Sequence, residues 1–170
     1  MGTWNDTDRP IAYLITFRTY GTWLPGDARG TIDKRHNIYG GPRADSNIIL
    51  EQQNAGILKS DAFLMGAKAR QAVKNAIREV CVHREWKLYA QCVRINHVHA
   101  VTASTASSDK VLLDLKAYST RSLRKLGLWT YQHSPWVDKG SKRNLWNGDH
   151  IFYACDYVIN GQGRDLPEFD

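Results

Sequence analysis

The chain has 170 residues, of which 42% are hydrophobic and 24% charged, and its formal net charge is +6. This length suits one domain with its own hydrophobic core, and no apolar run approaches the roughly 20 residues that a membrane-spanning helix requires. Residues 1–10 are polar and contain no apolar signal core, so we predict a cytoplasmic protein that is not bound to a membrane. The basic charge favours polyanionic partners, above all nucleic acid.

The first third of the chain is predicted to contain one strand and one long loop. Residues 11–19 are rich in β-branched and aromatic side chains, which is typical of a strand. Glycine and proline punctuate the next stretch, and polar residues continue to about Asp61. We therefore predict a loop over residues 20–61. Loops of this length are uncommon in small domains and are often functional.

A helix and two strands are predicted in the middle of the chain. From Asp61, which is the candidate N-cap, to about Arg84, apolar residues recur at helical spacing. Residues 87–94 alternate between apolar and polar side chains, which indicates a strand, and residues 97–104 continue as a second strand.

The last third is predicted to contain helix, strand and helix. One helix runs from Asp109 to about Leu126, strand-like pieces lie within residues 136–146, and a final helix capped by Asp149 covers residues 149–159. The first six elements have the order of a ferredoxin-like α+β sandwich. We predict a single domain, residues 1–170, in which helices cover one face of an antiparallel sheet and leave the other open for a partner. The final helix is an addition to that fold.

Two histidines mark the second of the middle strands. In a strand, His97 and His99 point to the same side, whereas Val98 points to the other. Two neighbouring imidazoles can bind a metal ion together. The same pattern is also produced by two surface or half-buried histidines that bind no metal.

The helix over residues 109–126 surrounds one tyrosine with positive charge. Lys116, Arg121, Arg124 and Lys125 suit contact with a phosphate backbone, and Tyr118 lies among them. A phenol with its usual pKa of about 10 is a poor nucleophile, but cations or a metal-polarised phosphate make its attack feasible. The alternative is an amphipathic surface helix with a half-buried tyrosine.

Together these motifs resemble those of the HUH-type single-tyrosine transposases, which include small bacterial insertion-sequence enzymes and REP-associated tyrosine transposases. The resemblance is carried by the strand His97-Val-His-Ala-Val101 and by the helix that contains Ala117-Tyr-Ser-Thr-Arg-Ser-Leu-Arg124. The opening run Tyr13–Asp27 is also similar to the start of a subgroup of these proteins. The resemblance extends over essentially the whole chain.

The resemblance implies a ferredoxin-like enzyme that cuts and rejoins single-stranded DNA, with hairpins beside the cut sites. It implies that His97 and His99 bind Mg²⁺ or Mn²⁺, that Tyr118 forms a 5′-phosphotyrosine intermediate, and that the protein is a homodimer. Many relatives supply a third metal ligand, often Gln, one helical turn after the tyrosine. Ser122 occupies that position here, and its hydroxyl is a weaker ligand.

Residues outside this helix complete the predicted DNA-contacting set. Trp23 is a candidate for stacking on unpaired bases, and Lys142 and Arg143 are candidates for contact with a hairpin stem. Tyr153 and Tyr157 are rival nucleophiles, but we interpret residues 152–159 mainly as core packing. Two alternatives to a transposase stay open: a catalytically impaired, ferredoxin-like protein that binds hairpin or single-stranded nucleic acid, and a metal-dependent hydrolase of small substrates.

Overall fold

The computed structural model describes residues 9–22 and 48–167. Its strands are β1 (Ala12–Arg18), β2 (Lys87–Val93), β3 (His97–Ala103) and β4 (Ser141–Leu145), and its helices are α1 (Ile48–Gly56), α2 (Ala67–His83), α3 (Ser108–Lys125) and α4 (Gly148–Asn160). None of the described helices is long and apolar enough to cross a membrane.

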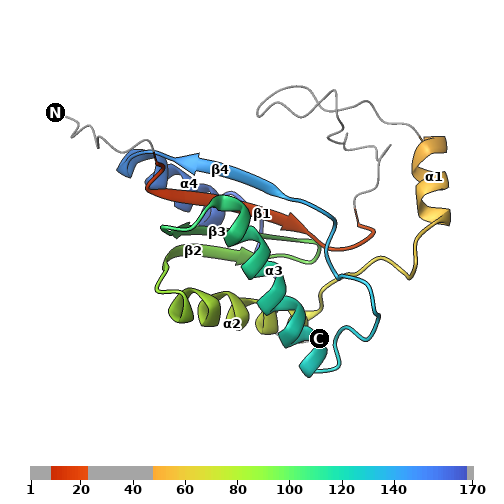
Figure 1. Ribbon diagram of the computed structural model, residues 1–170. Coiled ribbons are helices and arrows are strands. Elements are labelled where there is room, and N and C mark those ends of the chain that lie inside the picture. Colours follow the sequence, from red (N-terminus) through yellow and green to blue (C-terminus); the bar gives the residue numbers. More distant parts are fainter. Residues whose placement is uncertain (1–8, 23–47, 168–170) are drawn as a thin grey trace.

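The four strands form one antiparallel sheet in the order β2-β3-β1-β4 (Figure 1). With α2 between β1 and β2, and α3 between β3 and β4, this is the βαββαβ arrangement of a ferredoxin-like fold. The predicted α+β class is therefore confirmed. Pairing of the two central strands places Thr16 opposite His99 and Arg18 opposite His97.

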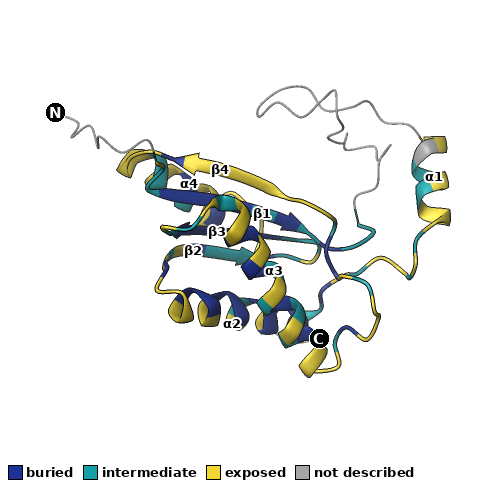
Figure 2. Cartoon of the chain, viewed as in Figure 1, coloured by how far each residue is buried: buried dark blue, intermediate teal, exposed yellow. Residues whose placement is uncertain are grey.

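The larger core lies between the sheet and the layer of α2 and α3. Strand residues alternate between the two faces, and the side chains that point toward α2 and α3 are almost completely buried (Figure 2). The main contributors are Ile15, Phe17, Val98 and Ala100 from the sheet and Val73, Ile77, Leu115 and Leu123 from the helices.

The opposite face of the sheet is partly covered by α4, which corrects the prediction of an open face. Figure 1 shows α4 behind the sheet, on the side away from α2 and α3. Ala154 and Val158 of this helix pack on Leu14 and Val101 in a second, smaller core. Asn147 caps the helix by accepting a hydrogen bond from the backbone N–H of His150. The predicted capping role of Asp149 is therefore wrong.

The beginning of α2 also differs from the prediction. The helix starts at Ala67, and Gly66, not Asp61, holds the N-cap position. The preceding residues are not helical, because their backbone groups bond to other segments. The N–H of Phe63 donates to Tyr20 O at 2.8 Å, and that of Met65 donates to Ile95 O at 2.8 Å.

The predicted loop over residues 20–61 contains a helix, α1, at its C-terminal end. This helix lies apart from the sheet and from the other helices (Figure 1). Its residues Ile48 and Ile49 are exposed, so the helix packs no apolar face against the core. Without such a face, helical spacing of apolar residues does not predict the helix from the sequence. Residues 23–47, which include the predicted stacking residue Trp23, lie outside the described residues.

Candidate functional site

His97 and His99 lie side by side on the face of the sheet that α4 covers. Their ring centroids are 4.9 Å apart, and His99 is only 5% exposed. Nδ1 of His99 lies 2.7 Å from Oγ1 of Thr16, and Nδ1 of His97 lies 2.7 Å from Oδ1 of Asn96. A polar partner thus orients each imidazole at Nδ1. Metal-binding histidines are commonly oriented in this way, by a partner at the ring nitrogen that does not bind the metal.

The surroundings keep both rings unprotonated at neutral pH. Burial lowers the pKa of His97, and the charges of Arg18 and Arg94 lower it further. Burial, followed by the neighbouring His97, lowers the pKa of His99 to about 4. Because a neutral imidazole has a free lone pair, both rings are in the state that binds a metal ion.

Gln162 brings an amide oxygen to the histidine pair. Its Oε1 lies 3.2 Å from Nε2 of His97, while its amide nitrogen donates to Tyr157 O at 3.1 Å. That second bond orients the amide, so an acceptor oxygen faces the ring. Nε2 of His97 and Oε1 of Gln162 can form a hydrogen bond when Nε2 carries the ring proton, and both atoms can act as metal ligands when it does not.

The donor set fits a small divalent cation. Neighbouring ligands of an octahedral ion with bonds of about 2.1 Å lie about 3.0 Å apart, close to the 3.2 Å between Nε2 of His97 and Oε1 of Gln162. Among residues 9–22 and 48–167, no three His, Cys, Asp or Glu side chains cluster as a metal site. The candidate donors His97, His99 and Gln162 are all uncharged at neutral pH.

Tyr157 on α4 completes this group. Its ring centroid is 5.4 Å from that of His99, and its side chain is 48% exposed. Tyr153, one turn earlier, is 69% exposed. The interpretation of residues 152–159 as mainly core is thus wrong for both tyrosines, because only Ala154 and Val158 of this segment are buried.

Tyr118 lies on the other side of the sheet, in the layer of α2 and α3. It packs against the larger core, and its ring stacks with the Arg121 guanidinium, whose Cζ is 4.3 Å from the ring centroid. Alternation along β3 turns Val98 toward this layer and both histidines away from it. Within one chain, the structure therefore does not bring Tyr118 to His97 and His99.

Ser122, the predicted third metal ligand, also lies in the helical layer. Its hydroxyl donates to Ala72 O on α2, at 3.4 Å, so the structure does not bring it to the histidine pair. Gln162, whose amide oxygen lies against His97, is a candidate ligand that the sequence analysis did not consider. A signal was available: Gln162 follows Tyr157 by five residues, just beyond the end of α4.

Two of the predicted DNA-contacting cations hold loops of the protein itself. Nζ of Lys116 donates to Val137 O at 2.8 Å, and burial lowers the pKa of this amine. Arg124 donates through Nη2 to Gln132 O at 2.9 Å and also bonds neighbouring carbonyls of that loop. Both side chains therefore position the connection between α3 and β4.

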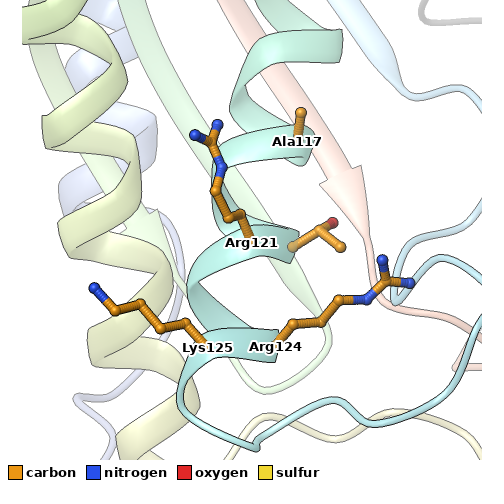
Figure 3. A pocket seen from close by; sticks show the side chains of 5 residues that line it. Ala117, Arg121, Arg124 and Lys125 are labelled. Atoms are coloured by element: carbon orange, nitrogen blue, oxygen red, sulfur yellow. The ribbon is translucent and has the colours of Figure 1, made fainter.

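The remaining predicted cations lie on two elements. Arg121 and Lys125, together with the aliphatic part of the loop-bound Arg124, line a shallow basic hollow on α3 (Figure 3). On β4, the Lys142 ammonium pairs with the Asp109 carboxylate, and the neighbouring Arg143 points to the opposite face by strand alternation. The hollow on α3 lies across the sheet from the histidine pair.

Comparison with known proteins gives one family match. Residues 57–158, more than half of the chain, match the family described as "Transposase IS200 like". The matched stretch includes both histidines and Tyr157 and ends before Gln162. No protein of curated function is significantly similar in sequence.

Two of the solved structures that the chain matches are both transposases or candidate transposases. One is a REP-associated tyrosine transposase bound to a REP hairpin, with 12% identity, a TM-score of 0.47, and coverage of 93% of this chain and 70% of that chain. The other is a candidate transposase from Deinococcus radiodurans R1, with 13% identity, a TM-score of 0.49, and coverage of 97% of this chain and 100% of that chain.

Proposed function

Because the chain belongs to the family of IS200-like transposases, we propose that it cuts and rejoins single-stranded DNA with Tyr157 as the nucleophile. The observation that carries this assignment is the 5.4 Å separation between the ring centroids of Tyr157 and His99, on one face of the sheet. Tyr118, which the basic helix had favoured, lies across the sheet. Tyr157 is also exposed, as a residue that reacts with a DNA strand must be.

Mg²⁺ or Mn²⁺ would be held by His97, His99 and Gln162. When bound, such an ion polarises a phosphate and stabilises the negative charge that develops during its substitution. The protein contributes the orientation of the ligands: Thr16 and Asn96 hold the two rings through Nδ1, and the bond to Tyr157 O aims the amide oxygen. Burial keeps the rings neutral at physiological pH.

The reaction that this arrangement supports is a transesterification at phosphorus. The Tyr157 oxygen forms a bond to phosphorus and gives up its proton to solvent, while the bond from phosphorus to the 3′ oxygen breaks. The leaving oxygen takes up a proton and becomes a free 3′-OH, and the tyrosine carries the 5′ phosphate. Attack by the 3′-OH of another strand reverses these steps and joins the two strands, with no external energy source.

The predicted substrate class and the predicted oligomeric state rest on the family resemblance alone. Hairpin-flanked single-stranded DNA and a homodimer stay predictions of the resemblance. Arg121 and Lys125 lie across the sheet from Tyr157, so they would contact DNA away from the scissile phosphate. Because one chain contains the histidines, Gln162 and Tyr157, a second copy is not needed to supply the nucleophile.

The test is covalent capture of DNA. The protein is mixed with Mn²⁺ and a pool of labelled single-stranded oligonucleotides that contain hairpins, and adducts are separated on a denaturing gel and mapped by mass spectrometry. We expect an adduct on Tyr157 and its loss, by at least about 100-fold, in Tyr157→Phe. Tyr118→Phe and Tyr153→Phe, the matched controls, retain it.

Two results would overturn the assignment. An adduct on Tyr118 or Tyr153, or a fully active Tyr157→Phe variant, refutes the choice of nucleophile. Complete absence of adducts in the wild-type protein, together with tight binding of hairpin DNA, favours the alternative of a catalytically impaired binding protein.

A further inference from the structure

The segment that follows α4 joins the two sides of the sheet. Residues 161–167, called the C-terminal strap below, leave α4 on the histidine face. Near the far end of the strap, Pro167 O accepts a hydrogen bond from Nη2 of Arg70, in the first turn of α2. Because α2 lies on the opposite side of the sheet (Figure 1), the strap connects the two layers. Gln162 is the residue of the strap that contacts the histidine pair.

Arg94 holds the middle of the strap. It lies in the turn between β2 and β3, and its Nη1 donates to Arg164 O at 2.7 Å. Gly163, which precedes that carbonyl, has a φ of +81°, a conformation that residues with a side chain rarely adopt. The bend at Gly163 and the bond at Arg164 therefore fix the course of the chain directly after Gln162.

Arg70 holds the far end of the strap and also supports the turn before β3. Its Nη1 donates to Met65 O at 2.9 Å, and the N–H of Met65 donates to Ile95 O at 2.8 Å. Ile95 precedes Asn96, whose Oδ1 contacts Nδ1 of His97. One guanidinium group thus connects the strap with the turn that orients the first histidine.

Packing alone does not account for an arginine at position 70. Its side chain is buried, with 8% of the residue exposed, and it lies near the positive end of the α2 dipole. Both features disfavour a cation, and a buried charge needs hydrogen bonds to offset its loss of water. Carbonyl oxygens of two separate segments supply such bonds. An apolar side chain would fill the space without that cost, so the guanidinium points to a role in joining the two segments.

We propose that Arg94 and Arg70 are positioning residues of the metal site, which hold the C-terminal strap so that the amide oxygen of Gln162 stays beside His97. The inference rests on the proposed function, because it takes Gln162 as a ligand of the divalent cation. Partners that orient metal ligands commonly contribute about 10-fold to 100-fold to metal affinity. Without an anchor, the strap leaves the histidine pair for part of the time, and the affinity for the cation falls accordingly.

The test measures Mn²⁺ binding, not catalysis. Free Mn²⁺ is quantified by electron paramagnetic resonance during titration of the protein and of Arg94→Met and Arg70→Met, whose side chains cannot donate to the strap. Loss of a positive charge would by itself strengthen the binding of a cation. We expect the opposite, namely affinity about tenfold weaker in Arg94→Met and at least about threefold weaker in Arg70→Met. Arg78→Met, which removes an exposed arginine from α2, is the matched control and keeps the wild-type affinity.

A double-mutant cycle separates positioning from a general effect on the fold. Gln162→Ala is expected to weaken Mn²⁺ binding by about tenfold. Adding Arg94→Met to Gln162→Ala should cause no further loss, because the ligand that Arg94 positions is then absent. Urea denaturation shows which variants are folded under the conditions of the titration. Since Arg94 is only half-buried, its variant keeps the test decisive even if Arg70→Met does not fold.

Several outcomes would overturn the inference. Wild-type or tighter Mn²⁺ binding by Arg94→Met refutes the positioning role, and so does a loss of equal size with and without the Gln162 side chain. If Gln162→Ala binds Mn²⁺ as tightly as the wild-type protein, Gln162 is not a ligand and the inference fails. A Tyr157 adduct in the wild-type protein would show in each of these cases that the proposed function stands. Absence of both Mn²⁺ binding and the adduct refutes the inference and the proposed function together.

Discussion

The buried imidazole of His99 is expected to make the protein sensitive to mild acid. In the unfolded chain its pKa is about 6.5, whereas in the folded protein burial, followed by the neighbouring His97, lowers the pKa to about 4. As pH falls below 6.5, the unfolded chain therefore takes up a proton that the folded protein does not bind. Linkage then favours unfolding, and the loss of stability is complete only below about pH 4.

The size of the effect follows from these two pKa values. With 1.36 kcal/mol for each unit of pKa difference, His99 lowers the free energy of unfolding by about 2 kcal/mol at pH 5 relative to pH 8. Such a loss is a large fraction of the stability of a typical domain. The pKa of His97 is lowered in the same direction, so it adds to the total but not to a difference measured by changing His99 alone.

The measurement is urea denaturation at pH 8, 6 and 5, with a chelator present so that no metal competes with protons. The matched variant is His99→Asn, whose side-chain amide can keep the contact with Thr16 but does not titrate. We expect the wild-type protein to lose about 2 kcal/mol more than His99→Asn between pH 8 and pH 5. Equal losses in the two proteins would show that His99 is not held neutral by the fold.

Two further predictions concern packing. Both amide atoms of Gln91 are buried without a hydrogen-bond partner in the described structure. Gln91→Leu is therefore expected to raise the free energy of unfolding, measured by urea denaturation, by about 1 kcal/mol. A lower free energy of unfolding in this variant would show that the amide has a partner. A Cβ on Gly140 would lie 2.7 Å from Thr16 O and 3.1 Å from Leu112 Cδ1. Gly140→Ala should therefore lower thermal stability by about 1–3 kcal/mol at the melting temperature, and an unchanged melting curve would contradict the close approach.

Most of the fold could be predicted because the signals are local. The strands β1, β2 and β3 and the helix α3 were predicted to within one or two residues, since alternation and helical spacing report directly on backbone conformation. Errors arose where distant segments decided the structure. Residues 61–66 have helix-compatible side chains but bond to Tyr20 and Ile95, and α1 lacks an apolar face.

The site was predicted in part. Strand alternation alone places His97 and His99 on one face, and the structure confirms this arrangement. The sequence pattern could not identify the tyrosine nearest to the histidines. The charge around Tyr118 is a property of one helix, whereas proximity to the histidines depends on which face of the sheet that helix covers. The arginines near Tyr118 look like a phosphate site in sequence, but in the structure Arg121 stacks on its ring and Arg124 bonds a loop.

The sequence by itself therefore determined the order of the elements, the α+β class and the paired histidines, since each depends on residues close together in the chain. Only the tertiary structure decided that α4 covers the histidine face, and that Tyr157 and Gln162 accompany the pair in place of Tyr118 and Ser122. The physical reason is that a sheet has two faces. The pattern of β3 divides its side chains between them, but packing of Ala154 and Val158 on Leu14 and Val101 selects which helix meets the histidines.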